Sequence, residues 1–265
     1  MNLQPALQKR LKRFRKRLQR LQTDATAEHI HDFRIACREM LAGYPLIKTI
    51  YPAKCWRPLL KNALDALDQL RDLQQMQEHL LQQQVLQPSV VSSAFEQPLE
   101  KATQRWLDYA PSLQGKDFLL AIAAAEELLK PVSNLSEKLQ VAFEKQWQKA
   151  LRQTRKCLLG ADATDLKSLH RLRIRFKKIR YLLELLENDI SLPVPKKTLK
   201  QWQDMLGSVE DFRIMAKLAK ELELPVTLQL EFLSRADEQA RYCLGQRDTL
   251  AQLLQRIEDQ VGALL

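Results

Sequence analysis

The feature of the sequence that most constrains the fold is an internal repeat. Residues 9–80 align with residues 148–219 at a constant offset of 139 residues and without a gap. In one stretch of 53 aligned positions, ten are identical. A chain of 265 residues made of two copies of one unit is expected to fold as two domains, each large enough to bury a core. We place these domains at residues 1–132 and 133–265.

The local preference of the chain is helical almost throughout. It has six glycines and few runs of β-branched residues, and apolar residues recur at helical spacing between proline, glycine and polar breaks. We therefore predict an all-α fold of two tandem antiparallel four-helix bundles, without a sheet. The expected helices are 5–22, 27–50, 52–86, 90–110 and 116–130, and, after a boundary at 131–134, 136–159, 165–188, 195–222 and 226–262, with a candidate break at Gly245.

The positive charge is concentrated in two stretches. The net charge is +10, with eight basic residues from Lys9 to Arg20, seven from Lys167 to Arg180, and no acid in either stretch. A field of this kind attracts a polyanion such as nucleic acid, polyphosphate or an anionic membrane surface. A solvated basic face that serves only solubility is the alternative.

The repeat separates shared charges from unshared ones. With 15 basic residues in one 72-residue copy and 16 in the other, chance gives about three coincidences, but eight occur. On helices these positions form neighbouring stripes where guanidinium and ammonium groups converge on an extended phosphate chain. Lys12, Arg15 and Lys48 are unshared and are assigned to solubility. The shared residues are Arg10, Arg13, Lys16, Arg17, Arg34, Arg38, Arg57 and Lys61, with counterparts Lys149, Arg152, Arg155, Lys156, Arg173, Lys177, Lys196 and Lys200.

Two motifs recur in the same order in both halves. The first runs from His31 to Arg38 and again from Leu169 to Tyr181, and the second covers Leu67–Asp72 and Leu206–Asp211. In these motifs the chain resembles the CHAD family, the conserved histidine α-helical domain, over nearly its whole length. The resemblance implies two four-helix bundles related by pseudo-two-fold symmetry. It also implies binding of inorganic polyphosphate in a basic groove or cavity lined by both halves.

The resemblance implies phosphate contacts from the motif residues Arg34, Arg38, Arg173, Lys177, Lys178 and Arg180, and it singles out the histidines that give the family its name. In the first copy, Glu39 and Leu41 stand where the family usually has basic residues, so we expect the second half to bind more strongly or the cavity to be asymmetric. The full candidate polyphosphate-binding set is Arg10, Arg13, Arg17, His31, Arg34, Arg38, Arg57, Lys61, Lys149, Arg152, Lys156, His170, Arg173, Lys177, Lys178, Arg180, Lys196 and Lys200.

The histidines and acids leave alternatives open. His29 and His31 diverge by about 200° around a helix, which disfavours a shared metal ion. The pair His31 and Asp32 also lacks the upstream histidine of an HD phosphohydrolase, and we predict neither metal nor cofactor. The histidines either bind phosphate, gaining charge as pH falls, or are structural. The shared acids orient arginines, bind a bridging divalent ion or form structural salt bridges, the last being favoured; they are Asp65, Asp72, Asp204 and Asp211.

Nothing in the sequence indicates catalysis. There is no Gly-rich phosphate loop, nucleophile elbow or paired metal-ligand helix. Glu221–Pro225 is only superficially similar to the ExExK motif of CYTH triphosphatases, because proline replaces the lysine. We predict a binding protein and no enzyme. The alternatives are a general nucleic-acid or anionic-surface binder and an accessory to a phosphoanhydride hydrolase. The four tryptophans are expected in the core, which disfavours single-stranded nucleic acid.

The remaining signals concern the compartment. The four cysteines have no paired spacing, and Cys37 and Cys157 are expected to be buried thiols. No apolar signal core and no run of roughly 18 apolar residues is present. We expect a soluble, cytoplasmic protein without membrane insertion, whose partners are inorganic polyphosphate, polyphosphate granules or phosphate-metabolising enzymes.

Overall fold

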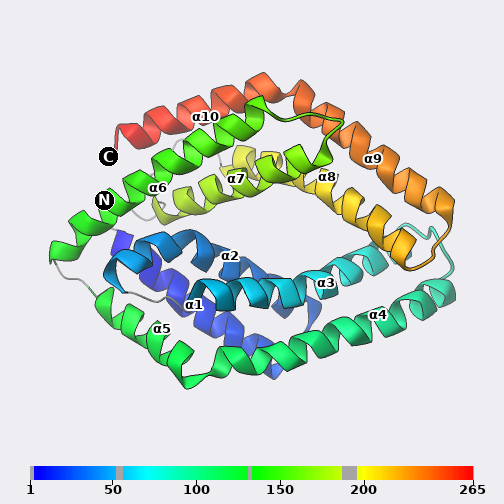
Figure 1. The fold of residues 1–265 in the computed structure, drawn as a ribbon, viewed down its shortest axis with the longest axis horizontal. Coiled ribbons are helices and arrows are strands. Elements are labelled where there is room, and N and C mark those ends of the chain that lie inside the picture. The colour runs from blue at the N-terminus through cyan, green and yellow to red at the C-terminus, as the bar shows by residue number, and fades with distance from the viewer. Residues whose placement is uncertain (1–2, 52–55, 131–132, 187–195, 265) are drawn as a thin grey trace. The chain divides into compact units, whose positions relative to one another are not determined.

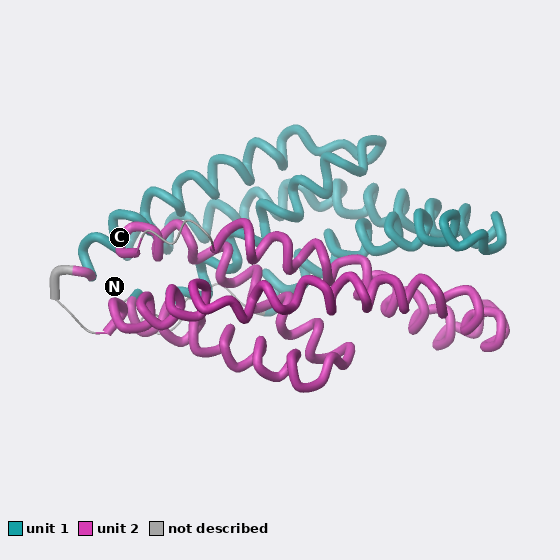
Figure 2. The backbone as a smooth tube through the Cα atoms, turned by 60° about the horizontal axis from the view of Figure 1, so that its bottom comes forward, with its two compact units in different colours: residues 1–3, 136–265 teal, residues 4–135 magenta. Residues whose placement is uncertain are grey.

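A computed structural model describes residues 3–51, 56–130, 133–186 and 196–264, and all regular structure in these ranges is helical (Figure 1). The predicted all-α fold is confirmed. Residues 4–135 form one compact unit and residues 1–3 with 136–265 form the other (Figure 2). We call them the N-terminal unit and the C-terminal unit.

Each unit contains helices that match the predicted segments closely. The expected helix 226–262 is two helices, one ending at Gly245 and the next beginning at Arg247. The candidate break at Gly245 is therefore confirmed. The expected boundary at 131–134 begins outside the described residues, and the division into repeats stays a prediction. The N-terminal helices are α1 (Leu3–Thr23), α2 (Ala27–Ile50), α3 (Trp56–Gln82), α4 (Pro88–Tyr109), a 3-10 turn η1 (Ala110–Gln114) and α5 (Lys116–Leu128). The C-terminal helices are α6 (Ser133–Leu159), α7 (Leu166–Leu186), α8 (Lys196–Glu221), α9 (Val226–Gly245) and α10 (Arg247–Gly262).

Helices α2 and α7 begin at equivalent positions of the repeat, at residues 27 and 166. In both, a side-chain oxygen just before the helix accepts a hydrogen bond from a backbone N–H of the first turn. Thr26 Oγ1 accepts from His29 N at 3.2 Å, and Asp165 Oδ1 accepts from Lys167 N at 3.0 Å. Such caps satisfy N–H groups that the helix itself leaves unpaired. The basic stripes of α2 and α7 therefore start in the same register.

Aromatic side chains hold the N-terminal unit together. The ring of Phe14 on α1 lies 5.4 Å from Phe33 on α2 and 6.2 Å from Phe118 on α5. Phe33 in turn lies 5.9 Å from Trp106 on α4, and Trp56 on α3 lies 6.4 Å from Phe118. Burial of these large rings fixes the packing of all five helices. The basic stripes of α1 and α2 are thereby placed next to each other.

The C-terminal core is built from equivalent elements. On α6, Phe143 and Trp147 are fully buried and their rings stack with centroids 6.3 Å apart. Phe212 on α8 lies 6.4 Å from Phe232 on α9, and Phe176 on α7 is fully buried. Helix α7 packs on α8, as α2 packs on α3.

The predicted burial of the tryptophans is confirmed, because all four are at most 4% exposed. Cys37 is buried as expected, but Cys157 is only half-buried, since it lies near the end of α6 beside the exposed Leu159. Cys55 lies outside the described residues. Within the described part of the chain, no helix has the length and apolar character needed to span a membrane.

Candidate anion-binding site

In the N-terminal unit, the shared arginines of α1 reach across to acids of α2. Arg13 Nη1 lies 2.9 and 3.1 Å from the two carboxylate oxygens of Glu39, which is buried. Arg10, also buried, donates from Nη1 to the backbone oxygen of Glu39 at 3.3 Å. One turn further on, Arg17 Nε lies 3.4 Å from Asp32 Oδ2. Two acids of α2 thus neutralise charges of the α1 stripe.

The shared arginines of α2 meet a single acid of α3. Arg34 donates from Nε and Nη2 to Asp68 Oδ1 at 2.9 and 2.5 Å, and Arg38 Nη2 lies 3.5 Å from the same oxygen. Burial, reinforced by the charge of Arg38, lowers the pKa of Arg34, while Asp68 and Asp72 oppose the shift. The guanidinium nevertheless stays charged, because arginine is not deprotonated in proteins. Two guanidiniums therefore converge on one oxyanion.

His31 begins the α2 stripe and is surrounded by positive charge. Burial, Arg71 and Arg34 lower its pKa below the ordinary value of 6.5, and Asp32 opposes the shift only in part. The neutral imidazole is therefore favoured. The charge that the sequence predicted His31 to gain as pH falls appears only at a lower pH than for an ordinary histidine.

The corresponding histidine of the C-terminal unit has the opposite environment. His170 Nδ1 on α7 lies 3.0 Å from Glu210 Oε2 on α8. Arg213 donates to both oxygens of this carboxylate, at 2.6 and 3.0 Å. Burial alone raises the pKa of Glu210, but hydrogen bonds and charge from Arg213 and His170 outweigh it and lower the pKa. Glu210 is only 4% exposed, so its carboxylate places a buried negative charge beside His170.

Arg173, the counterpart of Arg34, is held much less tightly. Its Nη2 lies 3.7 Å from Asp211 Oδ1, beyond hydrogen-bond distance. Its Nε is buried and has no hydrogen-bond partner among the described residues. A buried donor without a partner is costly, which makes this guanidinium a candidate to receive an outside oxyanion.

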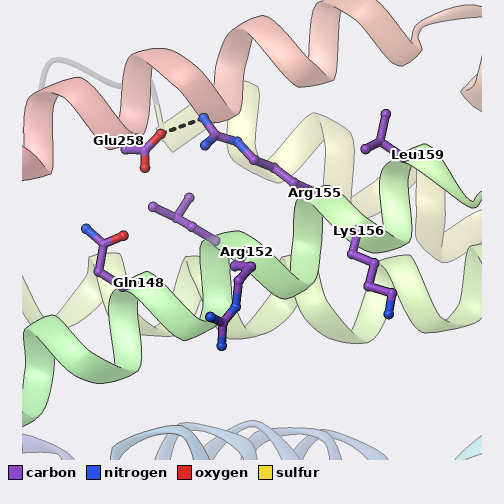
Figure 3. A pocket seen from close by; sticks show the side chains of 7 residues that line it. Gln148, Arg152, Arg155, Lys156, Leu159 and Glu258 are labelled. Carbon is purple, nitrogen blue, oxygen red and sulfur yellow. Dashed lines mark ion pairs between the residues drawn. The ribbon is translucent and has the colours of Figure 1, made fainter.

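Three of the four shared cations of α6 are exposed. Lys149, Arg152 and Lys156 are all exposed, and within the described part of the chain none of them forms an ion pair with a carboxylate. Figure 3 shows Arg152 and Lys156 pointing away from α10, whereas Arg155 points toward it. Arg155 pairs with Glu258 at 2.5 Å and so helps to join α6 to α10. Arg152, Arg155 and Lys156, with Glu258, line an open pocket of about 490 Å³.

The remaining predicted residues have more local roles. Lys178 donates to Gln146 on α6 at 3.3 Å. Arg180 pairs with Glu184 of its own helix at 3.3 Å and lies 4.8 Å from the ring centroid of Tyr181. Three further cations are exposed on the third helix of their units: Arg57, Lys61 and Lys200. The side chain of Lys196 lies outside the described residues.

Within the N-terminal unit, the structure thus brings together the predicted basic stripes of α1 and α2. The α2 stripe also contacts α3 through Asp68. Sequence reasoning missed the counter-ions Asp32, Asp68 and Glu210, because they are not shared between the copies. It noted Glu39 only as a departure from the family pattern. Of the shared acids, Asp211 contacts Arg173 and Asp72 acts on Arg34. Within the described residues, no three His, Cys, Asp or Glu side chains cluster as a metal site.

The family model of the CHAD domain matches residues 5–220 of this sequence. The chain belongs to the CHAD family. Among solved structures, a CHAD domain from the plant Ricinus communis is similar over 100% of this chain and 93% of that one, with 18% identity and a TM-score of 0.61. PptA from Streptomyces chartreusis is similar over 94% and 98% of the two chains, with 14% identity and a TM-score of 0.66. At these identities the likeness shows the CHAD fold alone. No curated protein sequence matches this chain.

Proposed function

We propose that this CHAD protein binds inorganic polyphosphate without chemically changing it. The shared basic side chains of α1 to α3 and of α6 to α8 are the contacts. Some members of the family bind polyphosphate, which supports this choice of ligand.

The observation that carries the proposal is the geometry around Asp68. Arg34 and Arg38 approach one oxygen of this carboxylate at 2.5 and 3.5 Å. A phosphate oxygen has the same charge and accepts the same hydrogen bonds as a carboxylate oxygen. The stripes are therefore spaced to hold oxyanions, and α7 carries the same basic positions with a less tightly bound acid.

A chain of phosphates fits such stripes better than a single phosphate does. Successive turns of a helix place side chains about 5 Å apart, so each turn can contact another phosphate of a flexible chain. Affinity should therefore rise with polyphosphate length, because the second and later contacts form at high effective concentration.

Titration of the full chain with polyphosphates of increasing length tests the proposal. We expect tighter binding by longer chains and, on adding salt, a loss of affinity of about 0.7 logarithmic units per contact for each tenfold rise in salt. Binding of pyrophosphate as tightly as long chains, or no binding of long chains at moderate salt, would contradict the proposal.

A general nucleic-acid binder is the second candidate, favoured by the net charge of +10. Single-stranded nucleic acid is usually held by bases stacked on exposed aromatics beside the charges, and the four tryptophans are buried. Competition of polyphosphate against RNA at equal phosphate concentration separates the two. Displacement of polyphosphate by RNA would favour the second candidate.

An enzymatic role as, or beside, a phosphoanhydride hydrolase is the third candidate, and we rank it last. Measurement of phosphate release from polyphosphate with Mg²⁺ or Mn²⁺ tests it, and we expect no release above background.

We further propose a cytoplasmic location at polyphosphate granules. A fluorescent fusion should then follow granules and disperse when cellular polyphosphate is depleted.

A further inference from the structure

We propose that Asp32, Glu39 and Asp68 are built-in competitors for the ligand, which weaken the N-terminal unit so that polyphosphate occupies the C-terminal unit first. This inference rests on the proposed function and assigns these three acids a role in setting affinity.

The three acids are absent from the equivalent positions of the second copy. At the offset of 139 residues, Asp32 corresponds to Arg171, Glu39 to Lys178 and Asp68 to Gly207. Each of these three acids contacts a shared arginine: the distances are 3.4 Å for Asp32, 2.9 Å for Glu39 and 2.5 Å for Asp68. The second copy therefore keeps the shared cations but lacks these three counter-ions.

The difference lies in where the charges are placed. Residues 9–80 contain 15 basic and 8 acidic residues, and residues 148–219 contain 16 and 8. The two copies thus have nearly equal net charge. In the first copy, three acids lie against the shared cations, whereas Glu210 of the second copy instead pairs with His170 and Arg213.

Arg213 corresponds to Gln74 and so belongs to no shared stripe. Among the residues described, Glu258 on α10 pairs with the shared Arg155 at 2.5 Å, but Glu258 lies outside the repeat. Within the second copy, the described acid that contacts a shared arginine is Asp211, which stands 3.7 Å from Arg173. Its counterpart Asp72 is present in the first copy too, so this acid does not distinguish the units. Asp32, Glu39 and Asp68, in contrast, occur only in the first copy and do distinguish the units.

A carboxylate can act on a neighbouring arginine in two ways. It can orient the guanidinium for a ligand, or it can take the place that the ligand needs and repel it. For Arg34 the second way applies, because Nε and Nη2 both donate to Asp68 and are not available to phosphate. For Arg13, Nη1 contacts both oxygens of Glu39, and the buried acid places a negative charge next to the stripe.

The first experiment removes one competitor without changing its shape. E39Q should bind long-chain polyphosphate roughly 3- to 10-fold more tightly than the wild type, because repulsion and competition are lost. E126Q is the matched control. The side chain of Glu126 is 15% exposed, against 7% for Glu39, and it pairs at 2.6 Å with Arg15, which is outside the shared set. Its replacement should therefore change affinity less than about twofold.

The second experiment introduces a competitor into the C-terminal unit. A Cβ atom at Gly207 has room, since it would meet nothing closer than Asp211 Oδ2 at 4.0 Å. G207D should weaken polyphosphate binding roughly 3- to 10-fold relative to its neutral match, G207N. Circular dichroism and thermal melting of all four variants show whether the fold is kept, and G207D and G207N leave every ion pair of the N-terminal unit intact.

The outcomes separate this inference from the function it rests on. A wild-type chain that does not bind polyphosphate contradicts the proposed function. If the wild type binds and E39Q is unchanged or weaker, the acids are neutral or orienting, and only the inference is overturned. Equal binding by G207D and G207N overturns it too, whereas tightening by E39Q together with weakening by G207D supports it.

Discussion

Arg34 and Arg173 occupy equivalent positions of the two units but face different surroundings. Arg34 makes two hydrogen bonds to Asp68, whereas Arg173 stands 3.7 Å from Asp211 and its buried Nε has no hydrogen-bond partner among the described residues. The same residue type on the same helical stripe is therefore satisfied in one unit and available in the other. Counter-ions on the neighbouring helix decide how much of a cation's charge reaches a ligand.

The largest expected effect comes from removing equivalent pairs of cations in the two units. R173Q/K177Q should weaken polyphosphate binding roughly 30- to 100-fold, because two charge-assisted contacts are lost, one of them from Arg173, which stands 3.7 Å from Asp211. R34Q/R38Q should lower the affinity for polyphosphate only roughly 3- to 10-fold, because Asp68 already offsets these charges. Titration of both variants gives the two affinities. Equal losses would mean that the counter-ions do not matter.

The α6 stripe gives the next largest effect. K149Q/R152Q/K156Q removes three exposed cations without carboxylate partners among the described residues. The magnitude of the slope of log affinity against log salt should fall by about two, because each of the three lost contacts contributes about 0.7 to it. K12Q/R15Q/K48Q changes the charge equally outside the shared stripes and should alter the slope by less than about 0.5. A similar slope change in both would indicate diffuse electrostatics.

A third prediction concerns stability and compares Glu210 with Arg71, its counterpart. Because the pKa of Glu210 is lowered on folding, its ion pairs stabilise the protein fully above the ordinary carboxyl value of 4.5 and are lost as pH falls through the lower folded value. E210Q should therefore lower the free energy of unfolding by about 1–3 kcal/mol at neutral pH. Chemical denaturation measures this free energy, and the difference between E210Q and the wild type should vanish in acid. R71Q should change the free energy of unfolding little at either pH.

The smallest effect is expected at His31. Because its pKa is lowered below the ordinary value of 6.5, less than half of the His31 rings are protonated at pH 6.5. H31Q keeps hydrogen-bonding capacity, so the affinity for polyphosphate between about pH 7.5 and 6.5 should follow the wild type within about twofold. A wild-type affinity that rises over this range and does not rise in H31Q would show that His31 gains its charge there.

Helical periodicity was enough to predict the all-α class and the approximate bounds of the helices. Helix α2 runs from Ala27 to Ile50 as expected, and the break beside Gly245 was visible as a candidate. These features depend on local preference and on breakers, which a single sequence displays. The four tryptophans were likewise predictable, because each lies on the apolar face of an amphipathic helix.

The electrostatic state of the site was harder to predict. The repeat pointed to Arg34 and Arg173. It could not show that Asp68 on another helix makes hydrogen bonds to Arg34, while Arg173 stands 3.7 Å from Asp211. Ion pairs between α2 and α3 depend on side-chain reach across a helix interface, and spacing along the chain does not report it. An acid opposite a shared cation, with glycine or a base at the equivalent position, is the signal that could have revealed it.

A crystal structure of the full chain grown with long-chain polyphosphate tests the central claim most directly. The account predicts phosphate oxygens within hydrogen-bond distance of Arg173 and of the α6 cations Arg152 and Lys156, with weaker density along the N-terminal stripes. Phosphates bound only at Arg13 and Arg34, or at none of the shared cations, would contradict it.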